Sequence, residues 1–215
     1  LLGLCLPRHS APLDAELARL RGHREERNLK ILDRLRSIGI NIGYQEVLDE
    51  AGGESVGRPH IARVLQKRGI VSNFAQAFEL YLGYYGAAYV PRTLLTPEEG
   101  VNLMADLGAV VSFAHPMLIR CPPSWFDEII PRLKEAGLGA IEAYHSEHSA
   151  RDERFCVELA ARYGLGLSGG SDYHGMAKPG VELGRGKGGL RVTVALLDAL
   201  KARRKRPVDD APEVL

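Results

Sequence analysis

The chain has few cysteines, almost no net charge and no long apolar run, and each shortage argues against a class of protein. Cys5, Cys121 and Cys156 are the three cysteines among 215 residues, and they form no C-x-x-C pair. This argues against a disulfide framework and a thiolate metal site, and it favours a reducing compartment, the cytoplasm. The 28 Lys and Arg residues nearly balance the 27 Asp and Glu residues, so the chain lacks the overall positive charge of a nonspecific nucleic-acid binder.

No apolar stretch approaches the ~20 residues that a membrane span needs. The opening LLGLCLP is too short for a signal peptide and lacks its basic flank, so we interpret it as a buried strand. Because the chain begins without Met, we expect residues of a parent protein to be missing from its amino end. The 45% content of hydrophobic residues is enough for a substantial core in one or two domains.

Helix and strand signals alternate from residue 96 onward. The clearest helix start has Thr96 as N-cap, followed by Pro97 and by Glu99 at the capping-box position. Predicted helices occupy residues 96–108, 122–137 (interrupted at Pro131), 149–164 (capped by Ser149) and 191–205, and predicted strands occupy 109–116, 138–146 and 165–174. Short connections between alternating elements favour a parallel α/β fold.

Residues 14–95 have a different pattern, which is helical almost throughout. We predict a long amphipathic helix at 14–40 and shorter helices at 44–52, 57–69 and 73–83, with the next strand at AAYVPR, residues 87–92. We interpret 14–88 as a helical insertion that caps the open end of the β/α part. The predicted division is 1–13 as a strand and loop, 14–88 as the insertion, 89–200 as β/α units and 201–215 as a tail.

Histidines and carboxylates follow the predicted strands where each strand stops. His115 follows VVSFA, Asp172 and His174 follow GLGLSGGS, and the segment from Glu142 to His148 ends the strand between them. In β/α barrels, chemistry is assembled at the carboxyl ends of the strands. Imidazole and carboxylate groups suit Zn²⁺, Mn²⁺ or Fe²⁺, although a lone histidine is as often structural. Taken together, His115, Asp172 and His174 are predicted metal ligands.

Several separated motifs resemble the C-terminal half of PHP-domain phosphoesterases. They are AHP at 114–116, GAIEAYHSEHS at 139–149, and GGSDYHG at 169–175 with the following KPGVELG. GRPHIARVL at 57–65 and YVPR at 89–92 narrow the resemblance to one subgroup. Members of that subgroup remove the 3′-phosphate from nucleoside 3′,5′-bisphosphates, and they include a 5′-to-3′ exoribonuclease and TrpH-like proteins.

This resemblance implies a distorted (β/α)7 barrel, of which the chain would be the C-terminal part with an α-helical insertion domain. It implies up to three divalent metal ions, commonly Mn²⁺, with Zn²⁺ or Fe²⁺ as alternatives. His115 matches the ligand of the AHP motif, and Asp172 and His174 match the ligands of the S-D-x-H motif. The family's H-x-H-x(4)-D motif and its other ligands have no counterpart here, so we expect the chain alone to be inactive.

The resemblance also implies substrate-binding residues. Arg24 and Arg27 match the family's R-x-x-R, and Arg58 and His60 lie at the start of the predicted helix at 57–69. Helix amides and guanidinium groups bind phosphate, although an arginine at a helix start is more often merely solvated. Lys178, after the S-D-x-H turn, either contacts phosphate or caps a loop.

The implied activity is metal-assisted hydrolysis of the 3′-phosphate of nucleoside 3′,5′-bisphosphates, such as the conversion of adenosine 3′,5′-bisphosphate (pAp) to AMP. Among the catalytic residues, Asp172 acts as a metal ligand, and His60 is a candidate proton donor to the leaving oxygen. Other residues are interpreted as supporting or solvent-facing: Glu142, His145, His148 and His23.

Two alternatives stay open. The same site would suit a 5′-to-3′ exoribonuclease that acts on short RNA 5′ ends if the insertion leaves an open exit. A non-catalytic metal-binding fragment is the alternative from a different class. The expected partners are a small nucleotide substrate or short RNA, with no membrane and no obligate protein partner.

Overall fold

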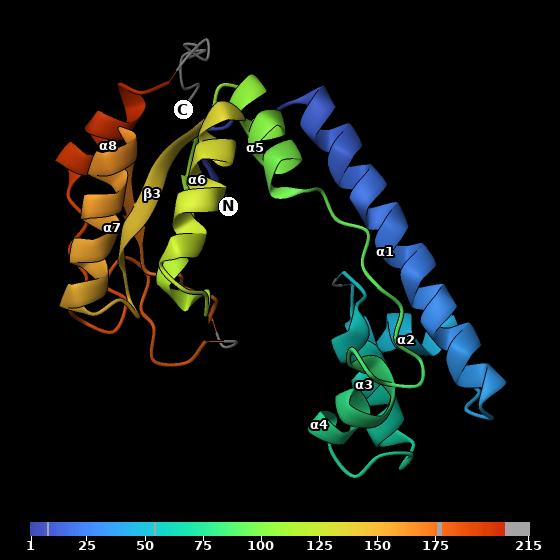
Figure 1. Ribbon diagram of the computed structural model, residues 1–215. Helices are drawn as coiled ribbons and strands as arrows, with labels where there is room; N and C mark the ends of the chain where they lie inside the picture. Colours follow the sequence, from blue (N-terminus) through green and yellow to red (C-terminus); the bar gives the residue numbers. More distant parts are fainter. Residues whose placement is uncertain (8, 54, 176–177, 205–215) are drawn as a thin grey trace, which may run out of the picture. The chain divides into compact units, whose positions relative to one another are not determined.

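The computed structural model describes residues 1–7, 9–53, 55–175 and 178–204 (Figure 1). The chain divides into two compact units, which we name the sheet unit (Leu1–Ser10 with Leu95–Leu215) and the helical unit (Ala11–Leu94). Of the predicted tail at 201–215, only residues 201–204 lie within the described ranges. No helix within these ranges is long and apolar enough to cross a membrane.

The sheet unit is built around a four-stranded sheet in the order β1-β2-β3-β4. The strands are β1 (Leu2–Leu4), β2 (Val110–Phe113), β3 (Leu138–His145) and β4 (Gly166–Gly170). Strands β2, β3 and β4 pair in parallel, so their carboxyl ends meet at one edge of the sheet. The predicted α/β class is confirmed, and this edge is where the predicted histidines and carboxylates lie.

The prediction of a buried first strand is wrong. Strand β1 pairs antiparallel with β2, through Leu2 opposite Ser112 and Leu4 opposite Val110. It lies at the edge of the sheet, with one neighbouring strand, so Leu2 is exposed and Leu4 is only half-buried. The apolar composition of LLGLCLP indicated a strand but carried no information about its place in the sheet.

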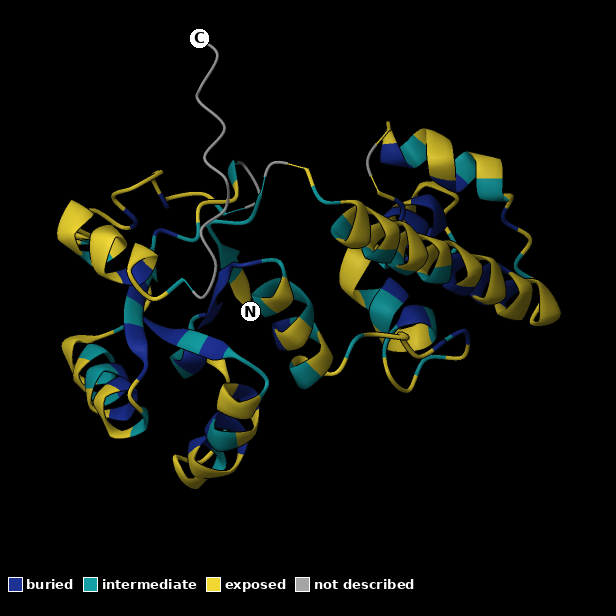
Figure 2. Ribbon diagram, turned by 90° about the horizontal axis from the view of Figure 1, so that it is seen from above, coloured by how far each residue is buried: buried dark blue, intermediate teal, exposed yellow. Residues whose placement is uncertain are grey.

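Helices connect the strands at the positions that the sequence predicts. They are α5 (Pro97–Asp106), α6 (Ser124–Glu135), α7 (Ala150–Tyr163) and α8 (Val194–Lys201), with a short 3₁₀ turn, η2, at Pro116–Leu118. The predicted caps are confirmed: Thr96 Oγ1 accepts from the Glu99 amide at 3.2 Å, and Ser149 Oγ accepts from the Asp152 amide at 3.3 Å. In Figure 2 the strands of this unit are largely buried and each helix exposes one side.

The predicted interruption at Pro131 is wrong, because α6 runs through it without a break. Proline has no amide hydrogen, so one hydrogen bond inside the helix is missing. Phe126, Ile130 and Leu133 are almost completely buried in the core of the sheet unit. Packing of this apolar face keeps the helix continuous despite the missing hydrogen bond.

The helical unit contains α1 (Ala11–Ser37), α2 (Tyr44–Ala51), α3 (Arg58–Lys67), α4 (Phe74–Ala77) and a π-helical turn, η1, at Phe78–Leu82. Its core joins residues from each of these elements, and the largest buried side chains are Ile31, Leu35, Ile42, Ile61, Leu65 and Leu82. The helical prediction for 14–83 therefore agrees with the structure.

Residues 87–92 do not form the predicted strand. The main chain instead runs beside α1, and its carbonyl groups accept hydrogen bonds from arginine side chains of that helix. Arg27 Nε donates to Val90 O at 2.8 Å, and Arg34 Nη1 donates to Tyr89 O. We name residues 89–92 the strap. In a sheet, these carbonyl groups would accept hydrogen bonds from a neighbouring strand. Because arginine side chains supply the donors here, the segment is extended without being part of a sheet.

Candidate functional site

Two of the predicted metal ligands lie on strained turns at the carboxyl edge of the sheet. His115 follows β2 with φ 29°, and Asp172 follows β4 with φ 53°. Among the described residues, Cys5 is the one further non-glycine residue with positive φ. Side chains other than glycine adopt this conformation rarely, and it concentrates at functional sites. The strain therefore marks the same edge that the sequence motifs indicate.

Glu142 fixes the turn that carries His115. Its Oε2 accepts a hydrogen bond from the His115 amide at 2.7 Å, and the residue is 4% exposed. Burial raises the pKa of this carboxyl group, and the hydrogen bond from the His115 amide opposes the shift. A buried carboxylate on β3 thus holds the residue that follows the neighbouring strand, a supporting role of the kind that the sequence suggested.

Three imidazole rings lie in a row at this edge. The ring centroids of His115 and His145 are 5.5 Å apart, and those of His145 and His148 are 5.1 Å apart. Each ring has a buried nitrogen with no hydrogen-bond partner in the part of the chain that the structure describes: His115 Nδ1, His145 Nε2 and His148 Nε2. Burial lowers the pKa of His145, which favours the neutral imidazole that metals bind.

His148 has the clearest ligand geometry of the three. Its Nδ1 lies 2.8 Å from the carbonyl oxygen of Ala143 and must therefore carry the hydrogen, which leaves a lone pair on the buried Nε2. Sequence reasoning treated His145 and His148 as supporting residues because histidines within one strand end are usually structural. Their position in YHSEHS, at the same strand edge as His115 and Asp172, was the signal that could have identified them as candidate metal ligands.

Asp172 is the charged centre of this edge. Its Oδ2 lies 2.6 Å from Lys178 Nζ and 3.5 Å from His145 Nε2, and its Oδ1 lies 3.5 Å from His174 Nδ1. The hydrogen bond from Lys178 lowers the pKa of the carboxyl group. Lys178 also lies 3.7 Å from Glu147 Oε2, so it contacts two carboxylates.

The described residues do not form a closed metal-binding set. No group of three His, Cys, Asp or Glu side chains among them stands ready to hold one ion, and His115, Asp172 and His174 are therefore not assembled around a common centre. His174 is largely exposed, and Lys178 pairs with the carboxylate of Asp172. The donor types nevertheless fit a divalent metal, because buried unpartnered imidazole nitrogens stand beside an ionised carboxylate.

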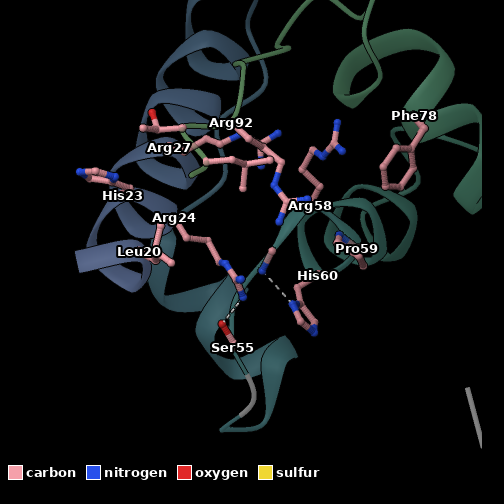
Figure 3. A pocket seen from close by; sticks show the side chains of 13 residues that line it. Leu20, His23, Arg24, Arg27, Ser55, Arg58, Pro59, His60, Phe78 and Arg92 are labelled. Atoms are coloured by element: carbon pink, nitrogen blue, oxygen red, sulfur yellow. Dashed lines mark hydrogen bonds between the residues drawn. The ribbon is translucent and has the colours of Figure 1, made fainter. Parts of the chain in front are cut away.

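The helical unit contains a cavity of about 440 Å³ that brings together the predicted phosphate-binding residues of this unit (Figure 3). Arg24, Arg27, Arg58 and His60 all line it. Residues that the sequence reasoning did not assign also line it, among them His23, Phe78 and Arg92. His23, which was expected to face solvent, is half-buried and lines the cavity.

Two of the arginines are held in place by neutral oxygens. Arg58 Nη1 donates to Leu82 O at 2.8 Å, and its guanidinium carbon lies 5.6 Å from the centre of the Phe78 ring. Arg24 Nη1 donates to Ser55 Oγ at 2.6 Å. These contacts orient the guanidinium groups, and no described acidic residue that lines the cavity neutralises their positive charges.

Arg27 is a buried cation for which the described residues offer no counter-charge. It is 8% exposed; its Nε donates to Val90 O, and its buried Nη2 has no hydrogen-bond partner among the described residues. Burial, and then the positive charges of Arg58 and Arg92, lower the pKa of Arg27. None of the described residues that line the cavity is acidic. A buried charge of this kind requires an anion, so the cavity is suited to bind one.

His60 contributes a hydrogen-bond donor to the same cavity. Its Nδ1 accepts from the Gly57 amide at 3.1 Å, just ahead of α3. Since Nδ1 is an acceptor, the neutral ring carries its hydrogen on Nε2. The expectation that Arg58 and His60 lie at a helix start is confirmed by α3, which begins at Arg58.

An α/β sheet with imidazoles and carboxylates at its carboxyl edge, together with an acid-free arginine cavity, has the residue types of a metal-dependent enzyme that acts on phosphoesters. No protein-family model matches the chain. The sequence is 30% identical to the 5′-3′ exoribonuclease Rnm of Escherichia coli, over 81% of this chain and 59% of that protein. It is 27% identical to a 3′,5′-nucleoside bisphosphate phosphatase of Chromobacterium violaceum, over 97% of this chain and 74% of that protein.

The structure resembles a solved protein from Bifidobacterium adolescentis described as a metal-dependent phosphoesterase, with a TM-score of 0.69 and 26% sequence identity over 94% of this chain and 70% of that one. These comparisons support the resemblance to PHP-domain phosphoesterases that the motifs indicated. It spans about three fifths of the length of the exoribonucleases that it matches, 57% of the Salmonella typhimurium protein and 59% of the E. coli protein.

Proposed function

We propose that the protein to which this chain belongs removes the 3′-phosphate from nucleoside 3′,5′-bisphosphates in a metal-dependent reaction. The observation that carries the proposal is Arg27, a buried guanidinium group to which the described residues offer no counter-charge, in a cavity that Arg24 and Arg58 also line. The name of the C. violaceum relative, a bisphosphate phosphatase, supports the choice of substrate. Phosphate binding suits the anion cavity of the helical unit, and phosphoester hydrolysis suits the metal-ligand side chains of the sheet unit.

In this proposal the helical unit binds one phosphate group. Arg27 and Arg58 supply the charge, Arg24 adds a guanidinium group at the wall, and His60 donates through Nε2. We propose no acid role for His60, the candidate proton donor, because a ring whose Nδ1 accepts from the Gly57 amide is neutral and would become an imidazolate on giving up its Nε2 hydrogen. Residues 14–88 thereby act as a substrate-binding insertion in the PHP fold.

The proposed metal ligands are His115, Asp172 and His174, and the metal is Mn²⁺, with Zn²⁺ or Fe²⁺ as alternatives. When bound, a divalent ion supplies charge stabilisation and an activated water for phosphoester hydrolysis. Glu142 holds the turn at His115, and His145 keeps a nitrogen 3.5 Å from Asp172. Lys178 leaves Asp172 and contacts phosphate in the loaded protein. We further propose that the four strands belong to a distorted (β/α)7 barrel and that the protein is cytoplasmic.

The test is phosphate release from pAp with Mn²⁺, measured for this chain and for the chain preceded by a segment that carries the family's H-x-H-x(4)-D motif. Release should require that segment and should fall to background for Asp172→Asn. Binding of pAp to the chain alone, measured by calorimetry, should weaken at least about tenfold for Arg27→Met. The proposal is wrong if two results are found together. The first is that pAp binds the Arg27→Met variant as tightly as the unaltered chain, and the second is that the extended chain, with metal bound, releases no phosphate from pAp.

Hydrolysis of short RNA from its 5′ end is the second candidate. The E. coli relative, an exoribonuclease at 30% identity, favours it. The two activities give different products, since the exoribonuclease releases mononucleotides from pApApA and the phosphatase releases inorganic phosphate from pAp. A comparison of both substrates at equal concentration separates them.

A further inference from the structure

Two exposed tyrosines project from the helical unit, and neither the metal ligands nor the arginine cavity accounts for them. Tyr85 is 94% exposed and Tyr84 is 70% exposed. The two rings are in contact edge to face, with centroids 4.9 Å apart, and Tyr84 also packs against Tyr89 at 5.3 Å. We name Tyr84, Tyr85 and Tyr89 the tyrosine cluster. Large aromatic groups this exposed indicate a binding surface when the chain fixes them in place.

The turn that presents the tyrosines is fixed. Gly83 donates to Phe78 O at 2.7 Å and Ala87 donates to Leu80 O at 2.9 Å, so both ends of the turn are tied to η1. A Cβ atom at Gly83 would lie 2.5 Å from Phe78 O, and one at Gly86 would lie 2.5 Å from Tyr81 O. Glycine is therefore required at both positions for the main chain to approach η1 this closely. The rings are displayed from a preorganised turn, which lowers the entropy lost on binding.

The tyrosine cluster is connected to the arginine cavity through the strap. Tyr89 is the first residue of the strap and Arg92 the last, and Arg92 lines the cavity. Three peptide steps span at most ~11 Å, so the cluster begins within about that distance of Arg92. Arg27 and Arg34 bind the carbonyl groups of Val90 and Tyr89, which fixes the strap along α1. The strap therefore joins the tyrosine cluster to the wall of the anion cavity over three residues of one unit.

We propose that the tyrosine cluster is a base-stacking surface for a single-stranded oligonucleotide whose terminal phosphate lies in the arginine cavity. Nucleobases stack on aromatic side chains whatever their identity, and arginines hold the phosphate groups beside them. A protein partner would explain the exposed rings but not the neighbouring cavity, which has positive charge and no described acidic residue. The inference rests on the proposed function and extends its substrate from one nucleotide to a short chain of nucleotides.

The test compares pAp, pApAp and pApApAp, which share both end groups and differ in the number of bases. Binding to the whole chain is measured by calorimetry with EDTA present, so that no hydrolysis occurs. For the unaltered chain, each added nucleotide should tighten binding at least about fivefold until the cluster is filled. The double variant Tyr84→Leu/Tyr85→Leu should lose this gain and bind pAp as before, and the matched variant Tyr84→Phe/Tyr85→Phe should keep it, because phenylalanine retains the aromatic face.

Three results would overturn the inference: no gain with length for the unaltered chain, a gain that the leucine variant retains, or a leucine variant that changes only the oligomeric state. The last result would assign the cluster to a protein interface. Failure of the proposed function looks different, because pAp itself would then fail to bind or would bind Arg27→Met as tightly as the unaltered chain.

Discussion

The side-chain nitrogen of Lys178 lies 2.6 Å from Oδ2 of Asp172, and this lysine is the nearest cation to the carboxylate that we assign to a metal ion. Two positive groups that share one carboxylate oxygen repel each other, so we expect a metal ion at Asp172 to displace the lysine. Glu147, whose Oε2 lies 3.7 Å from Lys178, is a second acceptor within reach. On the proposed metal assignment, Lys178 competes with the metal ion at Asp172 and has an alternative partner.

We expect Lys178→Met to bind Mn²⁺ about tenfold more tightly than the unaltered chain, a change of about 1.4 kcal/mol. The substitution removes the competing charge and keeps most of the side-chain volume. The measurement is calorimetric titration of Mn²⁺ into the metal-free chain. Lys187→Met is the matched control, because Lys187 pairs with Glu147 at 3.3 Å and has no ion pair with Asp172 among the described contacts. Equal or weaker Mn²⁺ binding by Lys178→Met would contradict the competition.

Arg27→Met should separate anion binding from folding. We expect phosphate or pAp binding to fall at least about tenfold, since a charged hydrogen bond contributes about 1.5–3 kcal/mol. The free energy of unfolding without phosphate should fall by no more than about 1 kcal/mol, because the substitution also removes a buried charge that lacks a counter-ion. Arg36→Met is the control on the same helix: Arg36 is exposed and pairs with Asp33 at 2.9 Å, so phosphate binding should not change. A large fall in the free energy of unfolding, with unchanged phosphate binding by the folded variant, would make Arg27 a structural residue.

Local signals in the sequence predicted most of the helices and strands. The caps at Thr96 and Ser149 depend on residues three positions apart, and both form as predicted. The strand-end residues His115 and Asp172 were found because parallel strands bring their carboxyl ends to one edge, which is a property of the topology. The continuity of α6 through Pro131 was not predicted, since it depends on how much of Phe126, Ile130 and Leu133 the core buries.

The rest of the candidate site depends on contacts between distant segments. Arg27 binds the carbonyl of Val90, 63 residues away, and no local pattern predicts that the strap lies along α1 instead of forming a strand. The same contact brings Arg92 towards the arginines of α1 and α3, with which it lines the cavity. Because this placement depends on a distant contact, the YVPR motif indicated a family but did not assign a role to Arg92. The bond from the His115 amide to Glu142 is equally non-local, because it joins the residues after β2 to the neighbouring strand β3.

Ser149 and Asp152 form a reciprocal cap at the start of α7 whose contribution depends on pH. Asp152 Oδ2 accepts from the Ser149 hydroxyl at 2.7 Å and from the Ser149 amide at 2.8 Å. These hydrogen bonds, the one from the hydroxyl first, lower the pKa of Asp152 below its ordinary value of 3.8. A carboxyl group with a lowered pKa in the folded state binds its proton more readily when unfolded, so it stabilises the fold above about pH 4, and this contribution is lost as the pH falls further.

Ser149→Ala should therefore lower the free energy of unfolding of the sheet unit by about 1 kcal/mol at pH 7, and the deficit should shrink below pH 4. The measurement is urea denaturation of the chain at a series of pH values. Ser124→Ala is the matched control, because Ser124 is exposed at the start of α6, where no side chain caps the helix, so its effect should be small and independent of pH. Asp152→Asn should give a deficit at pH 7 that likewise fades in acid. If the Ser149→Ala deficit is constant from pH 7 to pH 3, the ionised carboxylate contributes nothing to the cap.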